Sequence, residues 1–216
     1  MSVVSLVDVS KSFKRQSVLE NVTLVIEQGH CYGLSGPNDS GKSVLLYLLC
    51  GLMRPDSGTV SIESRFLSRD RTFPDRFGIS INGPAYLPEL SALENLTRLA
   101  SIRKRADEAE CADALKSLGL DPTSQLRVRS FSMGMRQKLA LAQAFIEDPE
   151  VLLLDEPFNA LDEASVAHVT KLLRQKIDMG MTIVMTSHHR IEIAALCDVT
   201  LRIVNRTIEQ TSPSKP

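Results

Sequence analysis

The segment 36–43, which reads GPNDSGKS, has the residue types and spacing of a phosphate-binding loop. It fits the pattern G-x-x-x-x-G-K-[ST], and the apolar runs 31–34 and 44–52 flank it, as the strand and helix around such a loop require. Backbone N–H groups and the positive end of the helix dipole would face phosphate oxygens. Lys42 would add a charge at the β- and γ-phosphates, and the Ser43 hydroxyl would reach Mg²⁺. The segment therefore predicts a nucleotide site.

Two adjacent carboxylates, Asp155 and Glu156, follow the wholly apolar run 151–154. Such a run is typical of a strand buried on both faces, and a solvated acidic end is its simplest interpretation. Beside a phosphate loop, however, Asp155 would hold the Mg²⁺ shell and Glu156 would polarise the attacking water as a general base. The metal charge would offset the repulsion between the two carboxylates. The loop and the acid pair together predict hydrolysis of a nucleoside triphosphate.

The elements that must position these residues follow one another in α/β order. Strands are expected at 3–9, 22–27, 31–35, 59–63, 77–81, 151–154, 181–186 and, as the final strand, 199–204. Helices are expected at 44–52, from the capping box Ser91-Ala92-Leu93-Glu94 onward, and at 107–118, 132–147, 163–177 and 190–197. We expect one domain over 1–210, with a core at about 1–84 and 149–210, a helical insert at about 85–148 and a polar tail at 211–216.

The composition excludes several classes of protein. Hydrophobic residues make up 43% and charged residues 24%, as in ordinary globular chains. A net charge of −1 gives no electrostatic case for nucleic acid as a partner, and 5% aromatics without Trp argue against a base-stacking surface. The longest apolar run, 44–50, is too short to span a bilayer, and the start lacks the apolar core of a signal peptide. The four cysteines are expected to be buried thiols of a reducing compartment: Cys31, Cys50, Cys111 and Cys197.

These motifs, in this order, resemble those of the ATP-binding-cassette (ABC) ATPases, the nucleotide-binding subunits of membrane transporters. The resemblance covers residues 3–204. FSMGMRQ at 131–137 looks like the family signature, NALD at 159–162 resembles the loop that meets the partner subunit, and TSH at 186–188 resembles the switch-histidine segment. The S-M-G-M form is similar to stand-alone cassettes that pair with separately encoded permeases for drug, peptide or polysaccharide export.

The resemblance implies a fold and a set of site residues. The fold is an α/β P-loop NTPase core of the RecA-like kind, with an antiparallel β subdomain and an inserted α-helical subdomain. The nucleotide contacts would be the adenine-stacking Phe13 and the loop residues Gly36, Pro37, Asn38, Asp39, Ser40, Gly41, Lys42, Ser43 and Val44. The metal ligands would be Ser43, Asn82 and Asp155, and the catalytic residues Glu156, His188, Lys42 and Asn82. The contacts to ATP held by a second copy would be Ser132, Met133, Gly134 and Met135, with Asp162 in the dimer loop.

The same resemblance implies ATP and Mg²⁺ as cofactors, a transmembrane permease as partner, and a homodimer or a paralogous cassette pair, without nucleic acid. The chain would lie in the cytoplasm, at the inner face of the cell membrane, and would reach the membrane only through the permease. The segment 83–90 would either help to form the permease groove or be an ordinary Pro-rich linker.

Four departures from the usual family pattern leave alternatives open. Asp39 stands where Gly is usual; Asp tolerates a left-handed backbone, but its carboxylate would weaken nucleotide binding. Val44 lacks the usual hydroxyl, and Asn82 replaces a longer Gln or Glu. Met133 and Met135 replace Gly and Gln, a known variant among export cassettes. A catalytically weak or regulatory nucleotide-binding cassette is therefore an alternative, as is an ABC ATPase that drives no transport.

Three of the residues also have simpler structural interpretations. Ser132 could be a helix N-cap, Phe13 a core residue, and His188 a surface histidine beside His189. Position 188, directly after an apolar strand, nonetheless favours the edge of the sheet where ligands bind in such folds.

Overall fold

The computed structural model describes residues 1–14, 16–67, 73–83, 85–188 and 190–211. Pro84 and His189, which two of the interpretations above include, lie outside the described residues, as does the tail 212–216. The strands are β1 (Ser2–Phe13), β2 (Gln16–Glu27), β3 (Cys31–Ser35), β4 (Ser57–Ile62), β5 (Phe77–Ser80), β6 (Val151–Leu154), β7 (Thr182–Thr186), β8 (Val199–Val204) and β9 (Thr207–Thr211). The helices are α1 (Lys42–Leu49), α2 (Ala92–Arg103), α3 (Glu108–Ser117), α4 (Met133–Phe145), α5 (Glu163–Asp178) and α6 (Arg190–Leu196), with 3₁₀ turns η1 (Ser64–Phe66) and η2 (Val128–Ser130).

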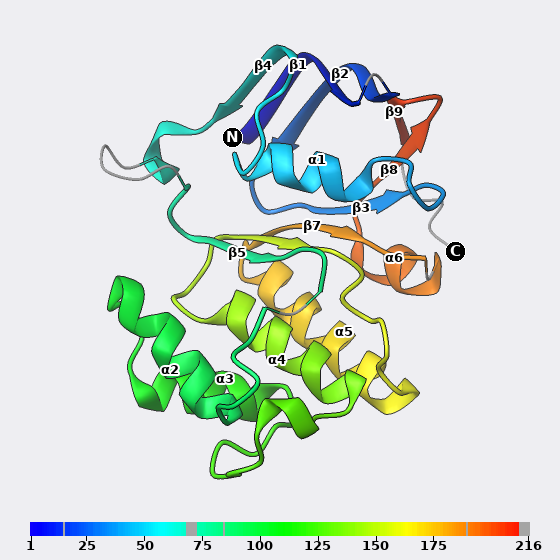
Figure 1. The fold of residues 1–216 in the computed structure, drawn as a ribbon. Helices are drawn as coiled ribbons and strands as arrows, with labels where there is room; N and C mark the ends of the chain where they lie inside the picture. Colours follow the sequence, from blue (N-terminus) through cyan, green and yellow to red (C-terminus); the bar gives the residue numbers. More distant parts are fainter. Residues whose placement is uncertain (15, 68–72, 84, 189, 212–216) are drawn as a thin grey trace.

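The described strands form two sheets in separate layers. The larger has the order β5-β6-β7-β3-β8-β9, and its neighbouring strands are parallel except for β8 and β9. The smaller, antiparallel sheet β2-β1-β4 lies above it, with α1 between the two sheets, whereas α4 and α5 lie below the parallel sheet (Figure 1). The arrangement confirms the expected α/β core with an antiparallel β subdomain, and α2, α3 and α4 are the helices of the expected insert.

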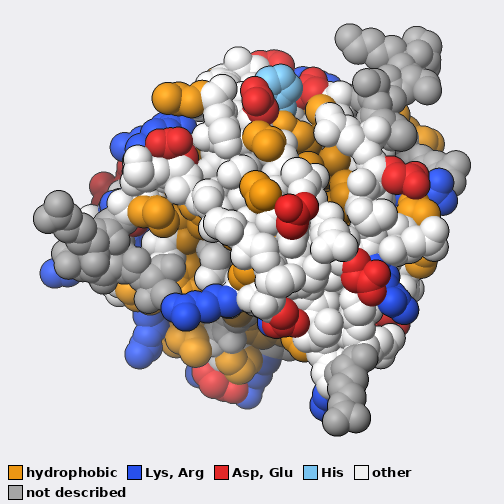
Figure 2. Space-filling view, turned by 90° about the horizontal axis from the view of Figure 1, so that it is seen from above, with side chains coloured by type: hydrophobic (Ala, Val, Ile, Leu, Met, Phe, Trp, Pro, Cys, Tyr) orange, Lys and Arg blue, Asp and Glu red, His pale blue; other side chains and the backbone are white. Residues whose placement is uncertain are grey.

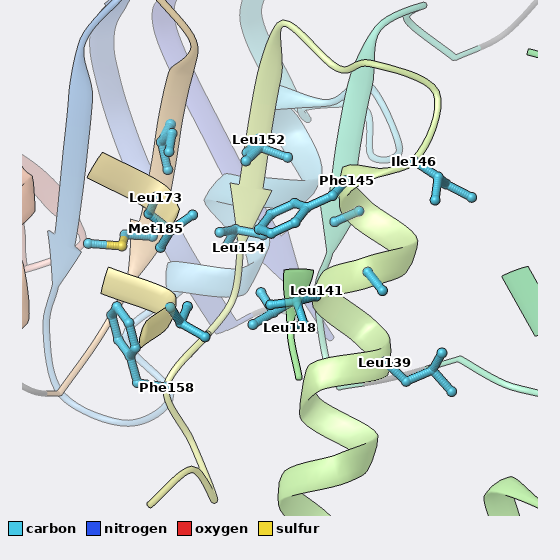
Figure 3. Close-up of a cluster of buried hydrophobic side chains, with 14 of the residues drawn as sticks. Leu118, Leu139, Leu141, Phe145, Ile146, Leu152, Leu154, Phe158, Leu173 and Met185 are labelled. Atoms are coloured by element: carbon cyan, nitrogen blue, oxygen red, sulfur yellow. The ribbon is translucent and has the colours of Figure 1, made fainter. Parts of the chain in front are cut away.

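Strand β6 shows how the sequence produces this layered core. All of its residues are buried: Val151 and Leu153 pack with α1 and the antiparallel sheet, whereas Leu152 and Leu154 pack with α4 and α5. Successive side chains of a strand point to opposite faces, so a strand between two apolar layers needs a continuous apolar run. Figure 3 shows Leu152 and Leu154 against the ring of Phe145 on α4.

The structure corrects the expected end of the sheet, because β8 is not the final strand. β9 pairs antiparallel with β8 across a turn at Asn205 and Arg206, whose φ angles are 48° and 68°. Positive φ at both central residues is typical of a type I′ hairpin turn. The sequence does not reveal this turn because Arg206 stands where Gly is usual, and because Ile208 is the one apolar residue of β9. β9 ends at Thr211, the first residue of the segment expected as a polar tail.

The β8–β9 turn is also attached to the antiparallel sheet. The backbone N–H of Glu20 on β2 donates to the Arg206 carbonyl oxygen at 2.8 Å, and the Arg206 guanidinium lies 2.8 Å from the Glu20 carboxylate. The hydrogen bond from Arg206 lowers the pKa of Glu20. The two sheets are therefore joined at this turn as well as through α1.

All four cysteines are free and buried, as expected: Cys31, Cys50, Cys111 and Cys197. In the part of the chain that the structure describes, no helix combines the length and the apolar character needed to cross a membrane.

The close approach of β5 and α4 can be tested at Gly78, where a Cβ would stand 2.0 Å from the carbonyl oxygen of Ala144. We expect Gly78→Ala to displace α4 and to lower the free energy of unfolding by about 2–3 kcal/mol, as in an overpacked core. Gly83→Ala is the control, because a Cβ there meets nothing within 4 Å and its φ of +84° strains only the backbone, by roughly 1 kcal/mol. Chemical denaturation measures both, and equal losses would contradict direct packing of α4 on β5.

Candidate functional site

The candidate site lies at the carboxyl-terminal edge of the parallel sheet, where ligands bind in doubly wound folds. β5, β6 and β7 are parallel neighbours, and the register pairs Leu154 with Ser80 on one side and with Met185 on the other. β3 is the parallel neighbour of β7 and leads into the loop 36–43. The residues that follow all four strand ends are therefore brought together beside this loop.

The strand ends and the loop surround an open cleft of about 710 Å³, within the range of small-molecule sites. The sequence-predicted residues that line it are Asn38, Asp39, Gly41, Lys42, Ser43, Val44, Asn82, Asp155, Glu156 and His188. The lining residues that sequence reasoning did not assign to the site are Gln16, Val18, Gly83, Gln137 and Asn159. Most of the predicted nucleotide, metal and catalytic residues thus lie in one cleft.

The backbone of the loop turns through left-handed conformations that few residues adopt. Asp39 has φ 60°, as expected for an Asp at a usual Gly position. Gly41 has φ 101° and precedes the first turn of α1, and a Cβ there would stand 2.7 Å from the Val18 side chain. α1 begins at Lys42 and ends at Leu49, so it starts and ends earlier than the expected helix 44–52. The free backbone N–H groups at the start of α1 therefore lie partly within the loop 36–43.

Lys42 folds back over the concave side of the loop. Its ammonium group donates to the carbonyl oxygens of Gly36 and Pro37, each at 2.9 Å. The residue is 9% exposed, so the charge lies at the floor of the cleft.

The Asp155 carboxylate is held by two hydroxyl groups from distant parts of the chain. Ser43 Oγ on α1 donates to Oδ2 at 2.7 Å, and Thr186 Oγ1 on β7 donates to Oδ1 at 2.6 Å. A hydroxyl and a carboxylate oxygen so close together are the kind of oxygen donors that a hard cation takes.

This donor set fits Mg²⁺ and not a closed protein cage. Among the described residues, no group of three or more His, Cys, Asp or Glu side chains could hold a metal by itself. Mg²⁺ is commonly bound by one or two protein oxygens together with water and substrate phosphates. Ser43 and Asp155 can supply this part of a Mg²⁺ shell.

Glu156 and His188 form a pair at the mouth of the cleft. His188 Nε2 lies 3.1 Å from Glu156 Oε1, and the His188 backbone N–H donates to Oε2 at 3.2 Å. The Glu156 side chain is 16% exposed, whereas that of His188 is 52% exposed. The carboxylate is therefore partly shielded from water but still faces the cleft, as a general base requires.

Asn82 lines the cleft, but its amide is engaged by α1. Its Nδ2 donates to the Tyr47 hydroxyl at 2.7 Å, and its backbone N–H lies 3.5 Å from Asp155 Oδ2. Tyr47 is one helical turn after Ser43 on the same face of α1. The amide thus contacts α1, the helix that carries Ser43, the predicted metal ligand.

The predicted adenine-stacking residue does not lie in the cleft. Phe13 is at the end of β1, 44% exposed, with Lys11 Nζ 5.6 Å from the centre of its ring. Its partner in the β1–β2 pairing, Gln16, lines the cleft instead.

The four signature residues predicted to contact ATP of a second copy also lie outside the cleft of their own chain: Ser132, Met133, Gly134 and Met135. Ser132 caps α4 by accepting the Met135 N–H at 3.2 Å, so the structural interpretation of Ser132 is confirmed. Met133 is 73% exposed, and a Cβ on Gly134 would stand 2.8 Å from the Ala160 carbonyl oxygen. The turn is therefore an exposed helix start that packs against the loop 159–162.

Asp162, predicted for the dimer loop, is the N-cap of α5. Its carboxylate accepts the Ser165 N–H at 2.8 Å, and hydrogen bonding by Ser165 lowers the pKa of Asp162. This bond fixes the end of the loop 159–162.

Gln137 is a site residue that sequence reasoning quoted within the signature but did not assign to the cleft. It is buried, and its Nε2 donates to the carbonyl oxygens of Glu156 and Pro157 at 3.3 and 3.1 Å. No local pattern of the sequence connects this side chain to the acid pair, because its bonding partners lie 19 and 20 residues later in the chain.

The face seen from above in Figure 2 carries Lys and Arg side chains interspersed with Asp and Glu. On the described part of this face, no continuous basic area stands out. This agrees with the balanced net charge of the chain.

Comparison with known proteins agrees with this geometry. A family model described as ABC transporter matches residues 19–159. The chain is 39% identical over 206 residues to the ABC transporter ATP-binding protein YybJ of Bacillus subtilis, covering 95% of this chain and 94% of that protein. It is 37% identical over 175 residues to the cytochrome c biogenesis ATP-binding export protein CcmA of Pseudomonas syringae, covering 80% and 81%. A solved structure of the ATP-binding subunit of an ABC transporter matches with a TM-score of 0.85 at 27% identity, covering 98% of this chain and 90% of that one.

The charge of Asp39 should weaken the binding of a nucleotide, because this residue lines the cleft within the predicted phosphate loop. We expect Asp39→Gly and Asp39→Asn to bind ATP about five- to tenfold more tightly, which corresponds to roughly 1 kcal/mol of charge repulsion. Gly and Asn both tolerate the left-handed backbone. The loss that the two replacements share is the negative charge. Isothermal titration at low and high salt measures the effect, which should shrink with salt. Equal affinities of Asp39→Asn and the unaltered chain would show that the carboxylate is accommodated.

Proposed function

Since the chain belongs to the ABC transporter family, as an ATP-binding subunit, we propose that it hydrolyses ATP with Mg²⁺ and thereby drives a separately encoded membrane permease. The proposed direction of transport is export, supported by the likeness to the export protein CcmA. The chain would act at the inner face of the cell membrane, which it would reach through the permease, and would need no nucleic acid.

The observation that carries the proposed hydrolysis is the position of the Glu156 carboxylate, in the cleft and next to Asp155. There Glu156 can take a proton from water as the water attacks the γ-phosphorus and the bond to ADP breaks. His188 Nε2 lies 3.1 Å from Glu156 Oε1 and would orient this carboxylate toward the attacking water.

The remaining residues of the cleft would hold the triphosphate. Lys42 would exchange the carbonyls of Gly36 and Pro37 for β- and γ-phosphate oxygens, and the first N–H groups of α1 would face the same phosphates. Ser43 and Asp155 would hold Mg²⁺, which when bound neutralises charge on the β- and γ-oxygens. Asn82 would join this shell after it leaves Tyr47.

We also propose that a second copy completes the site. The segment 132–135 starts α4, is largely exposed at Met133, and lies outside the cleft of its own chain. A helix start with a glycine and free N–H groups is suited to the γ-phosphate of ATP bound by another copy. Two copies, identical or paralogous, would close over ATP and exclude water other than the nucleophile.

A groove between the segment 85–87 and α2 is the proposed contact with the permease. Its volume is about 360 Å³. Three of its lining side chains, Leu87, Leu99 and Ile102, are 46%, 37% and 76% exposed. Apolar side chains gathered in one exposed groove are typical of a protein interaction site. They support the groove interpretation of the segment 83–90 over that of an ordinary linker.

Two amide side chains hold this segment in place. Gln143 on α4 donates to the Ala85 carbonyl oxygen at 2.9 Å. The buried Asn95 accepts the Leu87 N–H at 2.7 Å and donates to the Leu87 carbonyl oxygen at 3.1 Å. The floor of the groove is thus attached to α4, the helix whose start carries the signature.

A catalytically weak or regulatory cassette is the second candidate, and one observation favours it. The amide of Asn82 is shorter than that of Gln and is bonded to Tyr47, away from the metal position. Release of phosphate by the purified chain, with and without its permease, separates the two candidates. ATP binding without phosphate release in both conditions would favour the regulatory function.

The role of Glu156 predicts a selective loss of turnover. We expect Glu156→Gln to lower the rate of phosphate release by roughly 10²-fold or more while ATP binding is retained, because only the general base is removed. Glu209→Gln, an exposed glutamate on β9, is the control and should leave turnover unchanged. A rate for Glu156→Gln close to that of the unaltered chain would mean that another group acts as the base.

The groove predicts a position-specific contact with a membrane protein. A photo-crosslinking residue in place of Ile102 should join the chain to a polytopic membrane protein in cells that hold the assembled transporter. The same residue in place of Ile191, which is 82% exposed on α6, is the matched control. Mass spectrometry identifies the products. Crosslinking that is equal at both positions, or absent at 102, would remove the assignment of the groove.

A further inference from the structure

Thr186 joins the two carboxylate residues of the cleft through one hydroxyl group. It ends β7 and is fully buried. Its Oγ1 donates to Asp155 Oδ1 at 2.6 Å and accepts the backbone N–H of Glu156 at 2.8 Å. Since a hydroxyl has one proton, that proton is committed to Asp155, and a lone pair of the same oxygen accepts the Glu156 N–H.

The bond to Glu156 lies at an unusual backbone conformation. Glu156 has φ 50°, a left-handed value that a residue with a long side chain rarely adopts. Its N–H is held by Thr186 and its carbonyl oxygen by Gln137 Nε2 at 3.3 Å. The peptide groups on both sides of the Glu156 Cα are therefore anchored, and this conformation sets the direction in which the catalytic carboxylate leaves the backbone.

The bond to Asp155 fixes the rotation of the metal-binding carboxylate. Because Oδ1 accepts from Thr186, Oδ2 faces Ser43, whose hydroxyl is expected in the Mg²⁺ shell. One hydroxyl thus orients both the proposed metal ligand and the proposed general base.

A second buried threonine of the same strand shows that burial alone does not explain Thr186. Thr182 at the other end of β7 is also fully buried, and its Oγ1 accepts the Gly29 N–H at 2.9 Å. It lies roughly 13 Å along the strand from Thr186, outside the cleft. Thr182 has one backbone partner, whereas Thr186 has partners in both acidic residues.

We propose that Thr186 is a positioning residue for ATP hydrolysis, acting through the Asp155 carboxylate and the Glu156 backbone without touching the nucleotide. This inference rests on the proposed ATPase function. It makes the strand before His188 part of the catalytic machinery, in addition to His188 itself.

The test compares Thr186→Val, which keeps the shape and removes the hydroxyl, with Thr186→Ser, which keeps the hydroxyl. We expect Thr186→Val to lower kcat by about 10- to 100-fold, as loss of an outer-shell partner of a metal ligand does, with ATP affinity in the absence of Mg²⁺ unchanged. Thr186→Ser should recover turnover to within about threefold. Thr182→Val is the matched control and should keep full turnover. If Thr186→Val fails to fold, as judged by its thermal melt, Thr186→Ala takes its place.

The double variant with Glu156→Gln separates positioning from general loss of structure. If Thr186 acts largely through Glu156, adding Thr186→Val to Glu156→Gln should lower single-turnover hydrolysis by less than about threefold, because coupled residues are not additive. A full additional loss in the double variant, together with an unchanged Mg²⁺-dependent gain in ATP affinity in Thr186→Val, would overturn the proposal. So would a Thr186→Val rate within twofold of the unaltered chain, or an equal loss in Thr182→Val.

Failure of the proposed function gives a different result. If the unaltered chain binds ATP but releases no phosphate, the ATPase proposal fails, and the Mg²⁺-dependent gain in ATP affinity becomes the readout. Thr186→Val should then lose most of that gain while Thr186→Ser keeps it. An equal gain in both variants would overturn the positioning role itself.

Discussion

The hydrogen bonds to the Asp155 carboxylate are the interaction on which the site depends. Ser43, at the start of α1, and Thr186, at the end of β7, each donate to one of its oxygens. Hydrogen bonds to a carboxylate are roughly twice as strong as those between neutral groups, so these two bonds join α1 and β7 firmly to Asp155. It holds the phosphate loop, the acidic strand end and the strand before His188 in fixed relation. These three parts of the chain are far apart in sequence, and the parallel sheet alone would bring them only into the same region.

Local patterns were sufficient to predict the core of the fold and most of the cleft. The spacing of glycines around Lys42 and the four apolar residues before Asp155 each require one backbone context, which the structure contains. The resemblance to a known family added His188 and Asn82, which also line the cleft. These features were predictable because each depends on residues that are adjacent in sequence.

Other features depend on pairs of residues that no local pattern connects. The bond from Asn82 to Tyr47, the two bonds of Thr186 and those of Gln137 join distant segments through side chains that are ordinary in their own elements. β9 was missed because its pairing partner, and not its own polar sequence, makes it a strand. The position of Phe13 outside the cleft likewise depends on its pairing with Gln16, which lines the cleft instead, and composition and periodicity do not specify this pairing.

The attachment of Glu20 to the β8–β9 turn has a mechanical consequence. Together with the packing around α1, it fastens the antiparallel sheet to the parallel sheet at two separate places. The wall of the cleft formed by β2 and the wall formed by the phosphate loop are therefore held in fixed positions relative to each other. Swinging one wall away from the other would break both fastenings. A small molecule would then enter and leave through the open side of the cleft, and a second macromolecule that covers this side would control its passage.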